Sequence, residues 1–143
     1  MVTPTTPFGM EDPPLDPLRM FLSYGISFVA RGFSSDVKGV SALLQQASAH
    51  KGFAVIQLIS PCPTFNQVIT FDFMKSRVQP IPEDHDATDI DAAFRLALDT
   101  ERVYTGVFYR NEGIPTMGEK LDHQRKLTMD HQPRTVEGIF AQF

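Results

Sequence analysis

The sequence predicts an α/β domain in which a parallel sheet is flanked by helices. Two short apolar segments, ISFVA at 26–30 and FAVIQLIS at 53–60, are typical of buried strands, and the segment between them has helical periodicity. A strand, a helix and a second strand in this order predict a βαβ unit, whose strands pair in parallel. The length of 143 residues suits one domain or part of a larger one.

The composition narrows the class of protein. Hydrophobic residues make up 42% of the chain and charged residues 21%, which is ordinary for a globular domain and argues against disorder. The net charge of -4 comes without a basic stripe, so we expect no nucleic acid partner. No apolar run approaches the roughly 20 residues that cross a bilayer, and the N-terminus is not a secretory signal. One cysteine excludes an internal disulfide framework and favours the reducing cytoplasm.

The N-terminal third of the chain contains clear start and stop signals. Its first fifteen residues are rich in Pro and Thr, which predicts an extended segment. Asp16 is a plausible N-cap and Pro17 a first helical residue, and Gly25 ends this predicted helix. The strand at 26–30 follows.

The next helix is expected to begin at Ser34 or Ser35 and to end at Gly52. Its apolar stripe repeats at helical spacing, and its members are Val40, Leu43, Leu44 and Ala47. The strand at 53–60 is almost continuously apolar, which is typical of a strand whose sheet is covered on both faces. A long loop should then run from 61 to 87, with a short helix near 71–76.

The C-terminal half predicts one strong helix and one more strand. In the helix at 88–99, Thr88 and Asp91 match a capping box, and the strand is expected at 104–109. Thr116 and Glu119 match a second capping box, which predicts a short helix. Beyond His123 the chain turns polar, so we expect a domain over 1–123 and an irregular tail over 124–143.

Most patterns that could carry chemistry are incomplete. No Gly-rich phosphate loop occurs, and GVSAL lacks the final glycine of a nucleophile elbow. The acidic stretch EDHDATD around His85 lacks the spacing of a calcium loop, so a solvated loop is favoured over a metal site. His50, His123 and His131 have no evident partner, and surface roles are the default expectation for them.

Cys62 is the residue most open to a functional interpretation. It follows the predicted strand at 53–60 directly, at the edge of a parallel sheet where ligands commonly bind, and Pro61 and Pro63 would hold its sulfur in one direction. A lone cysteine is most often a small buried hydrophobe. A catalytic thiolate would need a neighbouring base, which the sequence does not place. The third interpretation is a ligand to a shared metal centre.

Several segments resemble the C-terminal half of the β subunit of 2-oxoacid:ferredoxin oxidoreductases, especially of the 2-oxoglutarate type. The most specific are FVARGF, HKGFA and SPCPTFN, and further agreement lies in TPTTPFGMEDPPLDPL, EDHDATDIDAAFRLAL and TGVFYRNEGIPTMGEKL. The resemblance reaches from near the start to about His123. It implies a partial thiamine-diphosphate-binding fold.

The resemblance also implies a role for the lone cysteine. The β subunits of this family have one [4Fe–4S] cluster on four thiolates, and the fourth matches Cys62 in SPCPTFN. The reaction is oxidative decarboxylation of a 2-oxoacid to its acyl-CoA with reduction of ferredoxin, and it uses thiamine diphosphate and Mg²⁺. The implied partners are an α subunit, ferredoxin, the 2-oxoacid and coenzyme A. The sequence leaves open which 2-oxoacid is used.

The family motifs that hold the thiamine cofactor lie upstream of the matching region. These are a Gly-Asp-Gly run followed by Asn, which binds Mg²⁺ and diphosphate, and a Gly-Gln loop beside the cofactor ring. We therefore expect a truncated or partial product or a split gene, which is inactive by itself. Two alternatives stay open, an inactive fragment and a free-standing α/β module with a redox-active thiol.

Overall fold

The structure is a computed structural model that describes residues 6–9, 11–130, 136 and 140. The chain forms two compact units, Met1–Glu112 and Gly113–Phe143, and each is described by itself. No helix in the described ranges is both long and apolar enough to cross a membrane.

The first unit is built on a four-stranded mixed sheet. The strand order is β2-β1-β4-β3. The strands are β1 (Phe28–Phe33), β2 (Ala54–Ile59), β3 (Val78–Pro80) and β4 (Val103–Arg110). β1 pairs with β2 in parallel, and β3 pairs with β4 in parallel, but β4 runs antiparallel to β1. The α/β class with helices over the sheet is confirmed, while the pairing of β1 with β4 departs from a purely parallel sheet.

The predicted βαβ unit is present. Strands β1 and β2 are joined by α2 (Val37–Ala49), and Phe28 pairs with Ala54 and Phe33 with Ile59. The helix begins later than expected, because Asp36 is its N-cap and accepts a hydrogen bond from the Gly39 amide at 2.9 Å. The expected start at Ser34 or Ser35 is therefore wrong. The amide of Ser34 instead donates to the carbonyl of Ile59 and extends the pairing of β1 with β2.

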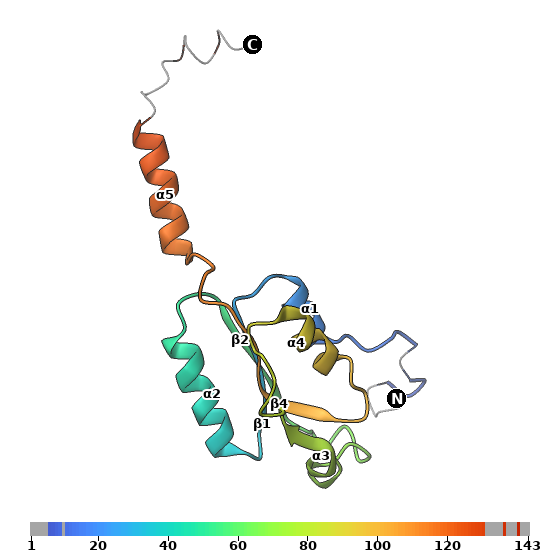
Figure 1. Ribbon diagram of the computed structural model, residues 1–143. Helices are drawn as coiled ribbons and strands as arrows, with labels where there is room; N and C mark the ends of the chain where they lie inside the picture. Colours follow the sequence, from blue (N-terminus) through green and yellow to red (C-terminus); the bar gives the residue numbers. More distant parts are fainter. Residues whose placement is uncertain (1–5, 10, 131–135, 137–139, 141–143) are drawn as a thin grey trace. The chain divides into compact units, whose positions relative to one another are not determined.

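Helices cover both faces of the sheet (Figure 1). One face packs against α2, with Phe28 and Ala30 buried in a small cluster around Leu43. The other face packs against α1 (Pro17–Ser23) and α4 (Ile90–Ala97), and it forms the larger cluster. The buried members of that cluster are Leu18, Leu22, Ile26, Val29, Ala93, Ala97, Tyr104, Phe108 and Tyr109. Consecutive residues of β1 thus face opposite layers, as the pleat requires.

The local capping signals predict some helix starts correctly and others not. Asp16 caps α1 and accepts from the Arg19 amide at 3.1 Å, which confirms the predicted start. The capping box of Thr88 with Asp91 is wrong, because Asp89 is the N-cap of α4 and accepts from the Asp91 amide at 2.8 Å. The hydroxyl of Thr88 donates to Asp86 instead.

The long loop after β2 contains two short elements. The expected helix near 71–76 is confirmed as α3 (Phe71–Arg77), which Thr70 caps. β3 follows it directly and was not predicted. It is three residues long and ends in a proline, so it carries no alternating pattern that could mark it in the sequence.

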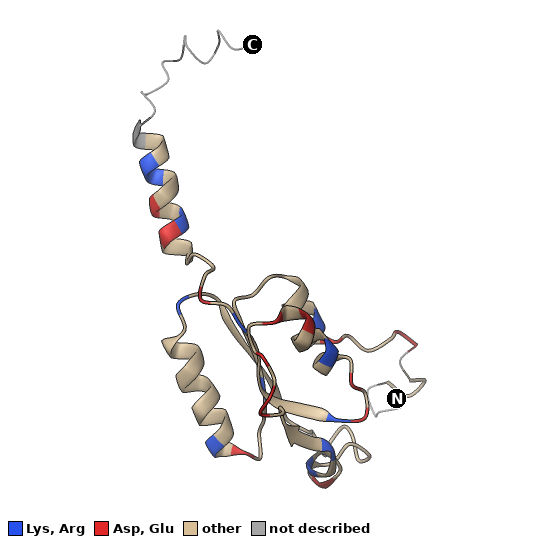
Figure 2. Ribbon diagram, in the orientation of Figure 1, with Lys and Arg blue, Asp and Glu red and all other residues tan. Residues whose placement is uncertain are grey.

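The continuous described part of the second unit, residues 113–130, contains the helix α5 (Met117–Asp130). Its predicted capping box is confirmed, since the Thr116 hydroxyl accepts from the Glu119 amide and the Glu119 carboxylate accepts from the Thr116 amide. Basic and acidic residues are interspersed along it (Figure 2). The expectation of an irregular chain is wrong for 124–130, because a polar segment rich in Gln, Arg, Lys and Leu still favours a helix. The other residues of the expected tail lie outside the described part, except 136 and 140.

Candidate functional site: a thiol turn and a half-buried cation

Cys62 lies on the surface, three residues after the end of β2. Its thiol is free and its side chain is exposed. The interpretation as a small buried hydrophobe is therefore wrong. The Cys62 carbonyl accepts hydrogen bonds from the amides of Phe65 at 3.3 Å and Asn66 at 3.0 Å, which closes a turn around the cysteine. The backbone that presents the sulfur is thus held in place before any ligand binds.

The chain after Cys62 is fixed by further local hydrogen bonds. The side-chain oxygen of Asn66 accepts from the amides of Val68 at 3.0 Å and Ile69 at 2.9 Å. Phe65 and Val68 nevertheless expose 51% and 76% of their surfaces. The cysteine is therefore surrounded by an ordered loop whose apolar side chains are not covered within the described residues.

The described residues fit one ligand of a metal cluster and no more. Among them, no group of three or more His, Cys, Asp or Glu side chains could hold a metal ion. An exposed thiol on a preformed turn suits a position shared with thiolates from elsewhere, since a [4Fe–4S] cluster takes four. This chain cannot supply the other three, because it contains a single cysteine.

The acidic stretch around His85 is used for structure. The imidazole Nε2 of His85 donates to the Phe108 carbonyl at 2.9 Å and ties the stretch to β4. Hydrogen bonds from the Thr88 hydroxyl and amide lower the pKa of Asp86 below its ordinary value. The favoured interpretation of this stretch as a loop before a helix agrees with these contacts.

His50 is buried, which corrects the surface role expected for it. Only 8% of the residue is exposed, and its Nε2 lies 2.9 Å from the Ser27 hydroxyl, which itself donates to the Phe53 carbonyl at 3.1 Å. Because that hydroxyl has one proton, Nε2 is the protonated nitrogen. Nδ1 then is a buried acceptor without a partner among the described residues. Sequence reasoning missed this contact because its partners lie 23 residues apart.

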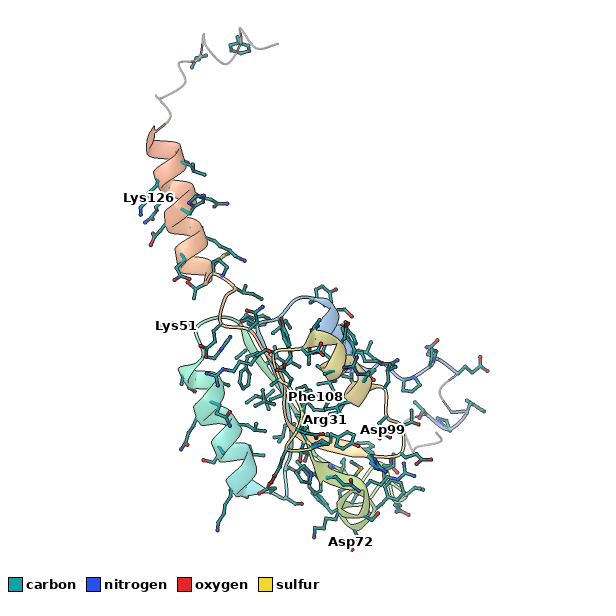
Figure 3. The ribbon with its side chains drawn as sticks, in the orientation of Figure 1. Arg31, Lys51, Asp72, Asp99, Phe108 and Lys126 are labelled. Atoms are coloured by element: carbon teal, nitrogen blue, oxygen red, sulfur yellow. The ribbon has the colours of Figure 1, made fainter. Side chains whose placement is uncertain are left out.

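Arg31 is a second residue that sequence reasoning missed. It lies in β1, and its Nε donates to the side-chain oxygen of Gln57 on β2 at 2.8 Å. Its guanidinium carbon lies 5.3 Å from the centre of the Phe108 ring (Figure 3). Burial lowers the pKa of Arg31, and the carboxylate of Asp16 partly opposes this effect. A charged residue inside the strand FVARGF was the available signal.

A shallow cavity lies after the end of β4. It has a volume of about 370 Å³ and is lined by Thr88, Arg110, Asn111 and Glu112. Arg110 and Glu112 form an ion pair within it, and Asn111 donates to the Tyr109 hydroxyl. Its charged side chains thus already have partners.

Comparisons with known proteins give one consistent family. Residues 62–126 match the family model for the C-terminal part of the pyruvate ferredoxin oxidoreductase beta subunit. The chain is 30% identical over 131 residues to the 2-oxoacid:ferredoxin oxidoreductase subunit beta of Saccharolobus solfataricus, covering 83% of this chain and 43% of that protein. It is 37% identical over 65 residues to the 2-oxoglutarate oxidoreductase subunit KorB of Mycobacterium tuberculosis, covering 46% of this chain and 17% of that protein.

A solved structure agrees with these relatives. The 2-oxoglutarate:ferredoxin oxidoreductase from Magnetococcus marinus, with 2-oxoglutarate, coenzyme A and succinyl-CoA bound, superposes with a TM-score of 0.81 at 37% identity. The match covers 96% of this chain and 47% of that one, so the chain spans about half the length of the relatives it matches. The chain belongs to the family of 2-oxoacid:ferredoxin oxidoreductase β subunits and corresponds to their C-terminal part.

Proposed function

We propose that this chain is part of the β subunit of an enzyme that oxidatively decarboxylates a 2-oxoacid, with 2-oxoglutarate as the first candidate. The products are the acyl-CoA, carbon dioxide and reduced ferredoxin, and the enzyme works in the cytoplasm together with an α subunit. The observation that carries the proposal is the 37% identity across 96% of this chain to a 2-oxoglutarate:ferredoxin oxidoreductase. The KorB relatives, which are named for 2-oxoglutarate, support the choice of substrate.

Cys62 is proposed as one thiolate ligand of a [4Fe–4S] cluster. Three observations support this role: the thiol is free and exposed, the turn that presents it is closed by two backbone hydrogen bonds, and the family-model match begins at this residue. The cluster would supply a one-electron relay to ferredoxin. The contribution of this chain is to hold one sulfur in a fixed direction, through the two backbone hydrogen bonds to the Cys62 carbonyl.

Thiamine diphosphate and Mg²⁺ are proposed as the other cofactors. Thiamine diphosphate provides the electron sink that decarboxylation of a 2-oxoacid requires. Among the described residues, no group of three or more His, Cys, Asp or Glu side chains could hold a metal ion, so we place the ligands of Mg²⁺ in the rest of the β subunit. The role of this segment is then to complete the sheet and to present Cys62.

The test replaces Cys62 in a complete β subunit that carries this segment, purified with its α subunit. Cys62→Ser should lower bound iron and sulfide and reduce ferredoxin reduction sharply, because an alkoxide is a poor ligand for the cluster iron. Exchange of carbon dioxide with the carboxyl group of the 2-oxoacid should fall less, since that step does not need the relay.

Ser60→Ala is the matched control, because Ser60 is exposed on the same connection. It should change neither iron content nor ferredoxin reduction. Full iron content together with normal ferredoxin reduction in Cys62→Ser would contradict the ligand role.

The exposure of Cys62 also favours a second candidate, a redox-active surface thiol. If this candidate is right, the Cys62 thiol of the purified chain should be oxidised rapidly and reversibly, whether or not iron is present. Mass spectrometry after mild peroxide and after thiol reductant distinguishes it, because a cluster ligand would be protected in the assembled complex and this thiol would not.

A further inference from the structure

Arg31 is a half-buried cation without an ion-pair partner among the described residues. A guanidinium has five N–H donors, and the contacts found in this part of the chain use one of them, the Nε–H that Gln57 accepts. The carboxylate of Asp16 raises the pKa of Arg31 but already forms an ion pair with Arg19 at 2.8 Å. A charge held partly out of water normally has a partner, because removing it from water is costly.

The terminal nitrogens of Arg31 are open to a ligand. Among the described residues, the unpartnered side-chain polar atoms that are sealed from solvent belong to Ser34 and His50 alone. The two Nη groups of Arg31 are not sealed in this way. Since Gln57 fixes the Nε side of the guanidinium, the opposite edge is the one left for a bidentate acceptor.

The surroundings of this guanidinium select the kind of anion. The guanidinium carbon lies over the ring of Phe108, 5.3 Å from its centre, and an apolar ring at this side lowers the local dielectric constant, which strengthens electrostatic attraction. Asp16 contributes a negative charge near the guanidinium, which disfavours an acceptor with two charges. A phosphate, with up to two charges, commonly needs more than one cation, whereas a single carboxylate matches a single Arg fork.

The position in the sheet agrees with a ligand site. Arg31 lies two residues before the end of β1 at Phe33, which pairs with Ile59 at the end of β2. Cys62 follows three residues after Ile59, on the connection that leaves this edge of the sheet. Ligands of α/β sheets commonly bind at the carboxyl edge of parallel strands.

We infer that Arg31, held by Gln57 against Phe108, binds a carboxylate of the 2-oxoacid substrate. This inference rests on the proposed function for the identity of the ligand. Arg31 is then a binding residue that contributes to substrate specificity, and Gln57 is a positioning residue that acts through it.

The first experiment uses the 143-residue chain itself and needs no cofactor. Thermal unfolding is followed with and without sodium 2-oxoglutarate at constant ionic strength. The ligand should raise the melting temperature of the wild-type chain and leave that of Arg31→Met unchanged. Lys38→Met, which removes an exposed cation on α2, should keep the response. Without ligand, Arg31→Met should melt no lower than wild type, because it removes an unpaired charge.

The outcomes separate a ligand site from a structural one. A large drop in the melting temperature of Arg31→Met, with no effect of 2-oxoglutarate on the wild type, would overturn the inference in favour of a packing role. An equal response to inorganic phosphate would overturn the assignment to a carboxylate.

The second experiment uses the assembled enzyme. Arg31→Met should raise KM for the 2-oxoacid by on the order of tenfold or more, with a smaller change in kcat and unchanged iron content. Arg31→Lys keeps the charge but loses the forked guanidinium, so its KM should lie between those of the wild type and Arg31→Met. If KM does not change in an active enzyme, the inference fails while the proposed function stands. If the wild type has no activity with any 2-oxoacid, the proposed function fails and the binding measurement on the chain decides the site separately.

Discussion

Gly52 lies at the point where β2 enters the sheet, and we expect its replacement by alanine to destabilise the chain strongly. A Cβ at this position would lie 2.3 Å from the Ser27 hydroxyl and 2.9 Å from Nε2 of His50. The backbone φ is also +151°, a conformation that side chains with a Cβ rarely adopt. Gly52→Ala therefore strains the backbone and also disrupts the hydrogen bond between Ser27 and His50, which joins the end of α2 to the start of β1.

The magnitude follows from these two effects. Backbone strain at such a φ costs about 1–3 kcal/mol. Loss of the hydrogen bond between Ser27 and His50 leaves buried polar atoms unpaired and costs about 1–3 kcal/mol more. The expected loss in the free energy of unfolding for Gly52→Ala is therefore about 4 kcal/mol.

Urea denaturation followed by circular dichroism measures this loss, and Gly25→Ala is the matched control. Gly25 also has a positive φ of +68°, but a Cβ there meets no atom within 4 Å. Its replacement should cost only about 1–2 kcal/mol of backbone strain. In a Ser27→Ala background, Gly52→Ala should cost less than in the wild type, because the closest clashing atom is gone. Equal losses for Gly52→Ala and Gly25→Ala would refute the steric argument.

Three further outcomes are expected. Thr88→Val should raise the pKa of Asp86 toward its ordinary range, because the hydroxyl bond that lowers it is lost. The stabilisation by the Asp86 carboxylate is present above the ordinary Asp pKa of 3.8 and is lost as pH falls through the lowered pKa. An NMR titration of the Asp86 carboxyl group in the wild type and in Thr88→Val measures the direction of the pKa change. Thr116→Ala should reduce the helicity of α5, because it removes the hydroxyl that accepts from the Glu119 amide, a cap worth about 1 kcal/mol of helix stability. Thr128→Ala, inside the helix, should leave the helicity unchanged, and circular dichroism of both variants measures the difference. The chain by itself should not reduce a viologen dye with thiamine diphosphate, Mg²⁺, coenzyme A and 2-oxoacids, since its described residues include no group of three or more His, Cys, Asp or Glu side chains that could hold Mg²⁺. Clear turnover would contradict this.

The sequence by itself determined the elements whose signals are local. The first helix starts where Asp16 and Pro17 place it, because a cap and a fixed φ act within one turn. The βαβ unit follows from the spacing of two apolar strands around one amphipathic helix. The capping box of α5 was also predicted correctly, but the length of that helix was not, since polarity without a core face does not exclude helix.

The tertiary structure decided everything that depends on contacts between distant segments. The direction of β4 against β1, and the pairing of β3 with β4, are set by connections and packing that no periodicity records. Burial of His50 depends on Ser27 and Phe53, which reach it only when β1 and β2 pair. These features were therefore absent from the sequence-based expectations.

The candidate site divides in the same way. Cys62 was found from the sequence because a single thiol between two prolines is a local pattern, although its exposure required the structure. Arg31 was not found from the sequence, because its candidate role depends on a hydrogen bond to Gln57 on β2 and a contact with the Phe108 ring on β4. A strand residue has its chemistry set by neighbours on other strands, and those neighbours are chosen by register and topology rather than by proximity in the chain.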